Sequence, residues 1–206
     1  MKKERKFYYD TNSFWRFFIN EYVEKTKLTN DIKLYSPLNN QIQVTRIVSP
    51  WTIEEFFHTF ITSKSQEIKD EMRFPKKLEF PTNFFEKEIK KRTDVLTNVK
   101  SFLFLFSQEN IESRLINELF MSLIFAAREN NILHLKKGDK KIHSKDLLHI
   151  AYALSTKCQT FITCDQGFHL LKDVDIIKSL LSQYKLHELI ILNQQLSKIE
   201  YKIDFS

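Results

Sequence analysis

Acidic side chains recur at positions where an α/β protein would carry its chemistry. Asp10 ends the first apolar segment of the chain, and Asp165 ends a later one. Asp146 lies in the first turn of an expected helix, and Glu54 and Glu55 lie in the first turn of another. Ligands of parallel sheets bind beyond the carboxyl ends of the strands. We therefore expect these carboxylates to meet at one edge of a sheet.

Carboxylates gathered in this way repel one another unless a cation holds them together. Mg²⁺ and Mn²⁺ are suited to this role because both prefer oxygen ligands and keep water molecules for chemistry. A structural interpretation competes with the metal. An Asp or Glu near a helix N-terminus caps free amides or complements the helix dipole, at about 0.3–1 kcal/mol each. The spacing alone leaves both interpretations open.

The elements that must position these acids alternate between strands and helices. The expected strands cover residues 6–10, 41–48, 132–135, 160–165, 187–192 and 199–205, and the expected helices cover 13–22, 52–62, 84–106, 111–127 and 145–156. We expect Thr11, Asn12 or Ser13 to cap the first helix and Ser144 to cap the helix at 145–156, and a further pair of helices to follow residue 165. Such alternation predicts an α/β fold with a mostly parallel sheet covered by helices on both faces.

Glycine is the most restrictive part of the composition. The 206-residue chain contains only Gly138 and Gly167. Walker loops and G-x-G-x-x-G turns need several glycines so that backbone amides can approach phosphate, and the G-x-S-x-G elbow needs two at a fixed spacing. ATP-binding loops, Rossmann dehydrogenases and serine hydrolases of the elbow type are therefore excluded.

Cysteine content and hydropathy predict a cytoplasmic protein that does not enter a membrane. Cys158 and Cys164 are the only thiols and form no C-x-x-C pair, which favours a reducing compartment. The longest apolar stretch, residues 119–127, is far shorter than the ~20 residues of a membrane helix. The basic N-terminus reaches Asp10 before any apolar run of signal-peptide length.

Four short motifs, taken in order, resemble the PIN-domain nucleases. YYDTNSFWRFF at 8–18 resembles the opening strand, D-T-N and helix of that family, and SPWTIEEFF at 49–57 resembles its S-x-x-T-x-x-E motif. KDLLHIAYALSTKCQTFITCDQGF at 145–168 is similar to the remaining two motifs, D-x-x-x-x-A-x-A and T-x-D-x-x-F. The second motif places the family's glutamate on Glu55 rather than Glu54.

The resemblance implies a fold, an activity and a set of site residues. The fold would be a PIN-like three-layer α/β/α arrangement, and the activity that of a metal-dependent endoribonuclease using Mg²⁺ or Mn²⁺. The catalytic and metal-binding carboxylates would be Asp10, Glu55, Asp146 and Asp165, with Asn12 and Thr163 as accessory groups. The protein would be a toxin with an antitoxin partner, or a processing nuclease.

The chain departs from the small VapC-type toxins of this family between the second and third motifs. We expect a single domain over residues 1–206 with a helical insertion at roughly 64–131, and an additional polar loop at 24–40. The inserted helices would cover the sheet, form a homodimer surface or bind an antitoxin. These differences leave the four acids in place.

The net charge of +6 suits a polyanionic partner. The basic turn that contains Lys136, Lys137, Lys140 and Lys141 is a candidate for phosphate contacts, although such runs are also common on solvated surfaces. Two alternatives to the ribonuclease stay open. One is an inactive PIN-like scaffold that binds RNA or protein, and the other is a metal-dependent DNA nuclease.

Overall fold

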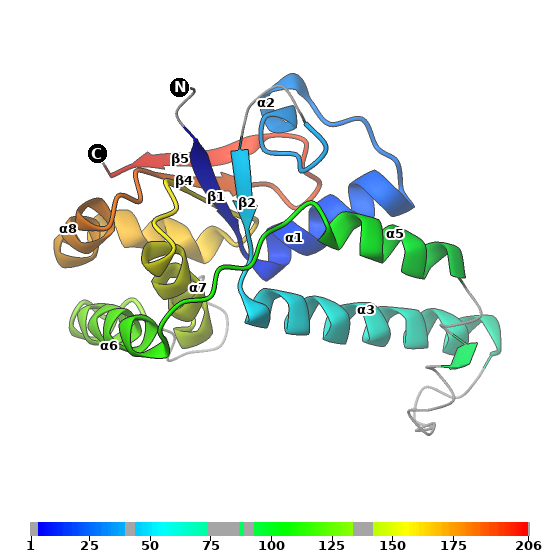
Figure 1. Cartoon of the computed structure of the whole chain (residues 1–206), viewed down its shortest axis with the longest axis horizontal. Helices are drawn as coiled ribbons and strands as arrows, with labels where there is room; N and C mark the ends of the chain where they lie inside the picture. The colour runs from blue at the N-terminus through cyan, green and yellow to red at the C-terminus, as the bar shows by residue number, and fades with distance from the viewer. Residues whose placement is uncertain (1–3, 40–43, 74–86, 89–92, 134–141, 206) are drawn as a thin grey trace.

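A five-stranded sheet forms the middle layer of the molecule (Figure 1). The computed structural model describes residues 4–39, 44–73, 87–88, 93–133 and 142–205. The strands are β1 (Arg5–Tyr9), β2 (Val44–Ile47), β3 (Thr160–Thr163), β4 (Glu188–Leu192) and β5 (Ile199–Asp204), in the spatial order β2-β1-β3-β4-β5. The first four pair in parallel, and β5 runs antiparallel to β4 at the edge. The predicted mostly parallel sheet is confirmed.

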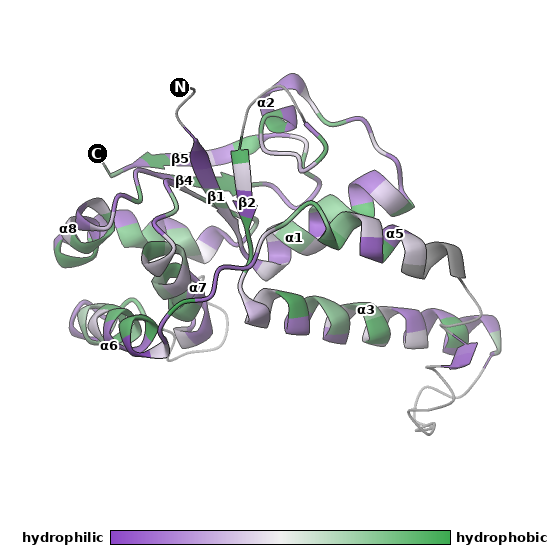
Figure 2. Cartoon of the chain, viewed as in Figure 1, coloured by the Kyte–Doolittle hydropathy of each residue, from purple (hydrophilic) through white to green (hydrophobic). Residues whose placement is uncertain are grey.

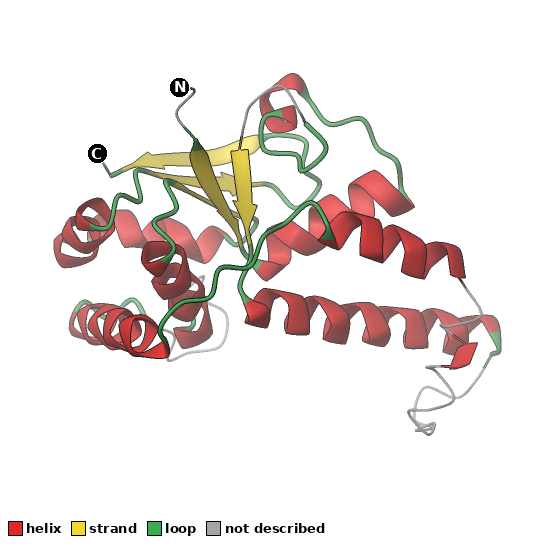
Figure 3. Ribbon diagram, in the orientation of Figure 1, coloured by secondary structure: helices red, strands yellow, loops and turns green. Residues whose placement is uncertain are grey.

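Helices surround this sheet on both sides (Figure 3). They are α1 (Thr11–Phe18), the π-helical turn η1 (Ile19–Val23), α2 (Asn30–Lys33), α3 (Pro50–Glu71), α5 (Thr93–Leu103), α6 (Ser113–Glu129), α7 (Ser144–Ser155), the 3₁₀ segment η2 (Gln166–Asp173) and α8 (Asp175–Gln183). No helix in the described ranges combines the length and the apolar character that crossing a membrane requires.

Successive residues of the strands serve two separate hydrophobic cores, as the two-residue period of a strand requires. Tyr8 and Phe161 point into a core shared with α6, α7 and α8. Their neighbours Tyr9 and Ile162 point into a second core shared with α1, α3 and α5. Both faces of the sheet are therefore buried under helices, which makes the chain a layered α/β protein.

Phenylalanine rings dominate the core on the α1 side. Phe14 of α1 has its ring centroid 5.0 Å from Phe56 of α3, 4.8 Å from Phe102 of α5 and 4.7 Å from Phe106. Edge-to-face pairs of this kind contribute beyond the area that they bury. In Figure 2, α3 alternates between hydrophobic and hydrophilic residues along its length, as expected of a helix with one buried side. The aromatic cluster thus fixes α3 and α5 against α1.

Helix α3 is longer than the sequence predicted, and this corrects the position of the glutamates. Ser49 caps it, and Pro50 occupies its first turn, so the helix begins before the expected residue 52. The helix also continues past residue 62 to Glu71, and buried Ile68 extends its apolar side beyond Phe60. Glu54 and Glu55 consequently lie in the second turn rather than the first.

Other boundaries shift by a few residues. Asp10 is the N-cap of α1 in place of Thr11, Asn12 or Ser13, and His143 replaces Ser144 as the N-cap of α7. Strand β3 ends at Thr163, so Asp165 lies two residues beyond it.

The less regular segments were predicted less well. The expected strand at 132–135 is reduced to an isolated bridge between Leu133 and Ile142, and residues 134–135 lie outside the described residues. Of the expected helix at 84–106, residues 87–88 and 93–103 are helical and residues 104–106 are not, while 84–86 and 89–92 lie outside the described residues. The loop at 24–40 contains the short helix α2.

Phe102→Ala should destabilise the protein by about 3–5 kcal/mol, because it removes a fully buried ring from the aromatic cluster. The matched control is Phe104→Ala, two residues away, whose ring is 88% exposed and whose loss should cost less than about 0.5 kcal/mol. Urea unfolding of the two variants measures the difference. Equal midpoints would contradict the role assigned to the cluster.

Candidate functional site

A polar cavity of about 640 Å³ opens at the carboxyl ends of β1, β2 and β3. The four carboxylates that the sequence singled out all line it, although they come from three distant stretches of the chain. The lining residues are Asp10, Thr11, Asn12, Trp51, Glu54, Glu55, His58, Thr59, His143, Lys145, Asp146, His149 and Asp165. The predicted meeting of these side chains at one edge of the sheet is what the structure shows.

Asp10 is the most buried of the four acids, with 4% of its surface exposed. Its Oδ1 accepts a hydrogen bond from Ser13 N at 2.8 Å and so caps α1. Its Oδ2 accepts a hydrogen bond from Thr163 Oγ1 at 2.6 Å, and that same hydroxyl accepts one from Asp165 N at 2.8 Å. Burial raises the pKa of Asp10 to about 6, against the opposing effect of these hydrogen bonds.

Glu55 is held by three neighbouring side chains. Its carboxylate accepts a hydrogen bond from Thr11 Oγ1, lies 3.5 Å from His149 Nε2 and lies 3.4 Å from Lys145 Nζ. The hydrogen bond with His149, followed by that from Thr11 and the charge of Lys145, lowers the pKa of Glu55 to about 2. Asp10 and Glu55 are therefore two carboxylates of one cavity whose pKa values move in opposite directions.

Asp146 and Asp165 each stabilise the start of a helix. Asp146 Oδ2 accepts a hydrogen bond from His143 N at 2.8 Å, and Asp165 Oδ1 accepts one from Gly167 N at 2.7 Å. The second oxygen of each carboxylate receives no hydrogen bond from the described residues. Burial, and then the negative charge of Asp165, raise the pKa of Asp146.

The serine and threonine of the S-x-x-T-x-x-E motif have a defined physical role. Thr52 N donates to Ser49 Oγ at 3.0 Å, which caps α3. Thr52 Oγ1 lies 3.2 Å from the hydroxyl of Tyr8, which in turn lies 2.7 Å from His149 Nδ1. Because Nε2 of the same ring faces Glu55, the motif positions its own glutamate through a buried chain of polar groups.

Three residues of this site were missed by sequence reasoning. His149 and Lys145 were not named as site residues, and Thr11 was named only as a candidate cap of the first helix. His149 follows Asp146 by three residues, so both lie on one side of α7, and that spacing was a usable signal. No comparable local signal marks the contact of Thr11 with Glu55, which joins residues far apart in the sequence.

The other residues considered fall at the margin or outside. Asn12 and Glu54 are exposed on the rim of the cavity, and Glu55 rather than Glu54 contacts Thr11, Lys145 and His149. The four lysines of the basic turn, Lys136, Lys137, Lys140 and Lys141, lie outside the described residues. Cys158 and Cys164 are both buried free thiols.

The donor set fits a hard divalent cation in its chemistry. All four acids offer oxygen, which Mg²⁺ and Mn²⁺ prefer. Burial raises the pKa of both Asp10 and Asp146, so a cation bound beside them would favour their charged forms. As the side chains stand, however, no three Asp, Glu, His or Cys groups within the described ranges converge closely enough to hold an ion. In this arrangement Lys145 and His149, rather than the other acids, face Glu55.

Comparison with known proteins gives no family for this chain. No protein-family model, curated protein or solved structure matches it. The site must therefore be interpreted from its own geometry.

Asp10→Asn should gain stability relative to wild type as the pH rises. An unfolded aspartate has a pKa of about 3.9, and burial raises that of Asp10 to about 6. Between these values the folded state binds more protons, so the free energy of unfolding of the wild type falls as the pH increases. Thermal melts in EDTA at pH 4 and pH 7.5 give the melting temperature of each protein. The melting temperature of the variant minus that of the wild type should be more positive at pH 7.5.

The control for this experiment is Asp175→Asn at the exposed start of α8. The hydrogen bond and charge of Lys178 lower the pKa of Asp175, so this substitution should produce a small change of the opposite sign. If the difference in melting temperature between Asp10→Asn and the wild type does not vary with pH, burial does not raise the pKa of Asp10.

Proposed function

We propose that this protein is a metal-dependent endoribonuclease that hydrolyses RNA phosphodiester bonds. The observation that carries the proposal is the meeting of Asp10, Glu55, Asp146 and Asp165 in one cavity at the carboxyl ends of parallel strands. Four acids from distant segments are more than helix capping requires, because Glu55 lies in the second turn of α3 and caps nothing.

The four carboxylates would hold one or two Mg²⁺ or Mn²⁺ ions. Bound there, the metal lowers the pKa of water and neutralises charge on the reacting phosphate. The second oxygens of Asp146 and Asp165 are available for this role, since hydrogen bonds from backbone amides occupy only the first oxygen of each.

The remaining polar residues would orient the acids and the substrate. Thr163 fixes the carboxylate plane of Asp10, and Thr11 and His149 fix that of Glu55. Outer residues of this kind are important because they set the direction of each ligand. Lys145, whose side chain is 67% exposed, stands at the mouth of the cavity and would contact a phosphate oxygen of the incoming strand.

The proposal includes membership of the PIN-domain nucleases, which rests on the order of the four motifs. Within that family we propose a toxin held in check by an antitoxin protein, with a processing nuclease as the alternative role. Growth arrest on expression of the wild type, relieved in Asp10→Asn, would distinguish the toxin. A homodimer, the remaining proposed partner, is tested by the mass of the protein in solution.

A second candidate function is supported by a specific observation. Asp10, Asp146 and Asp165 all stabilise helix starts in the present arrangement, as they would in an inactive scaffold that binds RNA or protein. A third candidate keeps the metal chemistry but acts on DNA. Both are separated from the main proposal by one cleavage assay.

Asp10→Asn and Asp165→Asn should each reduce cleavage of labelled single-stranded RNA by at least about 100-fold, because each removes a charged oxygen ligand. The assay compares Mg²⁺, Mn²⁺ and EDTA, and includes single-stranded DNA of the same sequence. Asp175→Asn on exposed α8 is the matched control and should cleave at the wild-type rate. Circular dichroism verifies that each variant is folded.

Each outcome of this assay selects one candidate. Cleavage in EDTA, or wild-type rates in Asp10→Asn, would overturn the metal mechanism. Cleavage of DNA but not RNA would select the DNA nuclease, and binding of RNA without any cleavage would select the inactive scaffold.

Replacing Lys136, Lys137, Lys140 and Lys141 together by serine should weaken RNA binding and flatten its salt dependence. Each lysine that neutralises a phosphate contributes about −0.7 to the slope of log K against log salt for single strands. Filter binding between 50 and 200 mM salt, roughly the range over which such contacts are lost, measures the slope. An unchanged slope would assign these lysines to solvated surface.

A further inference from the structure

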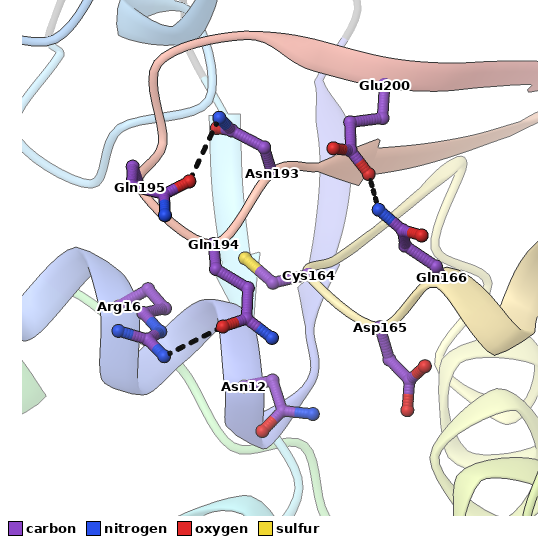
Figure 4. Close-up of a pocket in the computed structure, with 9 residues that line it drawn as sticks. All are labelled: Asn12, Arg16, Cys164, Asp165, Gln166, Asn193, Gln194, Gln195 and Glu200. Atoms are coloured by element: carbon purple, nitrogen blue, oxygen red, sulfur yellow. Dashed lines mark hydrogen bonds between the residues drawn. The ribbon is translucent and has the colours of Figure 1, made fainter. Parts of the chain in front are cut away.

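The structure has a second polar cavity, of about 480 Å³, whose lining is drawn in Figure 4. The two cavities share Asn12 and Asp165 as a common wall. The lining residues of the second are Asn12, Arg16, Cys164, Asp165, Gln166, Asn193, Gln194, Gln195 and Glu200. Its volume is within the range of small-molecule sites.

Side-chain carboxamides make up most of this lining. Gln194 Oε1 accepts a hydrogen bond from Arg16 Nη2 at 3.3 Å, which leaves the amide N–H groups of Gln194 as donors. The side chain of Asn12 makes no hydrogen bond with the described residues, and both of its polar atoms are available. Gln166 donates to the carboxylate of Glu200 across the far wall (Figure 4).

The loop that carries Gln194 and Gln195 is tied to a single side chain. Asn193 Oδ1 accepts hydrogen bonds from Ser197 N at 2.7 Å and Lys198 N at 3.2 Å, and Asn193 Nδ2 donates to Ser197 Oγ at 2.6 Å. The two glutamines therefore project from a fixed turn between β4 and β5.

The charge of the lining argues against an anionic ligand. Arg16 is the one cation among the described lining residues, and it is outnumbered by the carboxylates of Asp165 and Glu200. A phosphate would therefore be repelled, whereas an uncharged group rich in hydrogen-bond donors and acceptors would be accepted. No aromatic ring lines this cavity within the described ranges, so such a group would be held by its edge rather than by stacking.

We propose that this cavity binds the base of an unpaired nucleotide next to the cleaved phosphate and selects it through hydrogen bonds to its polar edge. The inference rests on the proposed nuclease function. Carboxamides pair well with base edges because each offers a donor and an acceptor side by side. Single-stranded RNA is recognised in this way, through exposed base edges. The shared wall of Asn12 and Asp165 places the base beside the acidic site.

Binding tests the proposal without depending on cleavage. The probes are a fluorescein-labelled uridine dodecamer and three derivatives with A, C or G at the central position. Fluorescence anisotropy in Mg²⁺ compares them in an Asp10→Asn background. The Kd values should differ by at least about fivefold between the best and the worst base, the lower limit for one good base contact.

The double variant Gln194→Ala/Gln195→Ala, in the same background, should reduce this difference to less than about twofold. The matched control is Gln183→Ala at the exposed end of α8, which should keep the full preference. Thermal melting verifies that the loop variant is folded. The variant loses the hydrogen bond from Asn193 Nδ2 to Gln195 Oε1 but keeps those that join Asn193 to Ser197 and Lys198.

Failure of this inference is distinguishable from failure of the nuclease proposal. Equal affinity for all four probes, no binding, or a preference that survives the double variant would overturn base selection. A preference that the double variant abolishes supports it even if the wild type cleaves nothing, and that result would refute only the nuclease. For a wild type that cleaves, mapped RNA ends should show one base enriched at a fixed distance from the cut, with the enrichment lost in the double variant.

Discussion

The buried carboxylate of Asp10 is the interaction on which the rest of the site depends. It lies where β1 ends, caps α1 through Ser13 N and is bound to β3 through Thr163 Oγ1. Burying a charge in this way is costly unless hydrogen bonds satisfy it. The chain therefore has to bring two neighbouring strands and one helix start to a single point. The register of β1 and β3 and the direction of α1 follow from that requirement.

The structural and the chemical interpretations of these acids turn out to be compatible. In a parallel sheet, helices start just beyond the carboxyl ends of the strands, so the best capping positions lie at the edge where ligands bind. Asp10 and Asp165 occupy such positions. A carboxylate has two oxygens, and one amide occupies only part of its capacity. Capping can thus hold a carboxylate in place while leaving it able to bind a cation.

Sequence reasoning predicted the strands and helices that a local pattern of residues specifies. It missed the features that depend on contacts between side chains distant in sequence. Strands β1, β3 and β4 were predicted because each is a short apolar run, which is typical of a buried strand. The sequence did not show that the helix at 52–62 continues unbroken to Glu71, because Ile68 gains its burial from residues that are distant in sequence. The role of His149 was missed for the same reason: its partner, the Tyr8 hydroxyl, lies across the core. Contacts of this kind have no signature in a single segment.

The turn after β4 contains a residue whose backbone is strained. Leu196 has a φ of 50°, in the left-handed region that bulky residues avoid, and its side chain is 1% exposed. Such a conformation costs about 1–3 kcal/mol and persists only where the surroundings impose it. Burial of the leucine and the hydrogen bonds of Asn193 provide that constraint. The turn is therefore preorganised, and it would lose less conformational entropy when a ligand contacts its glutamines than a loose loop would.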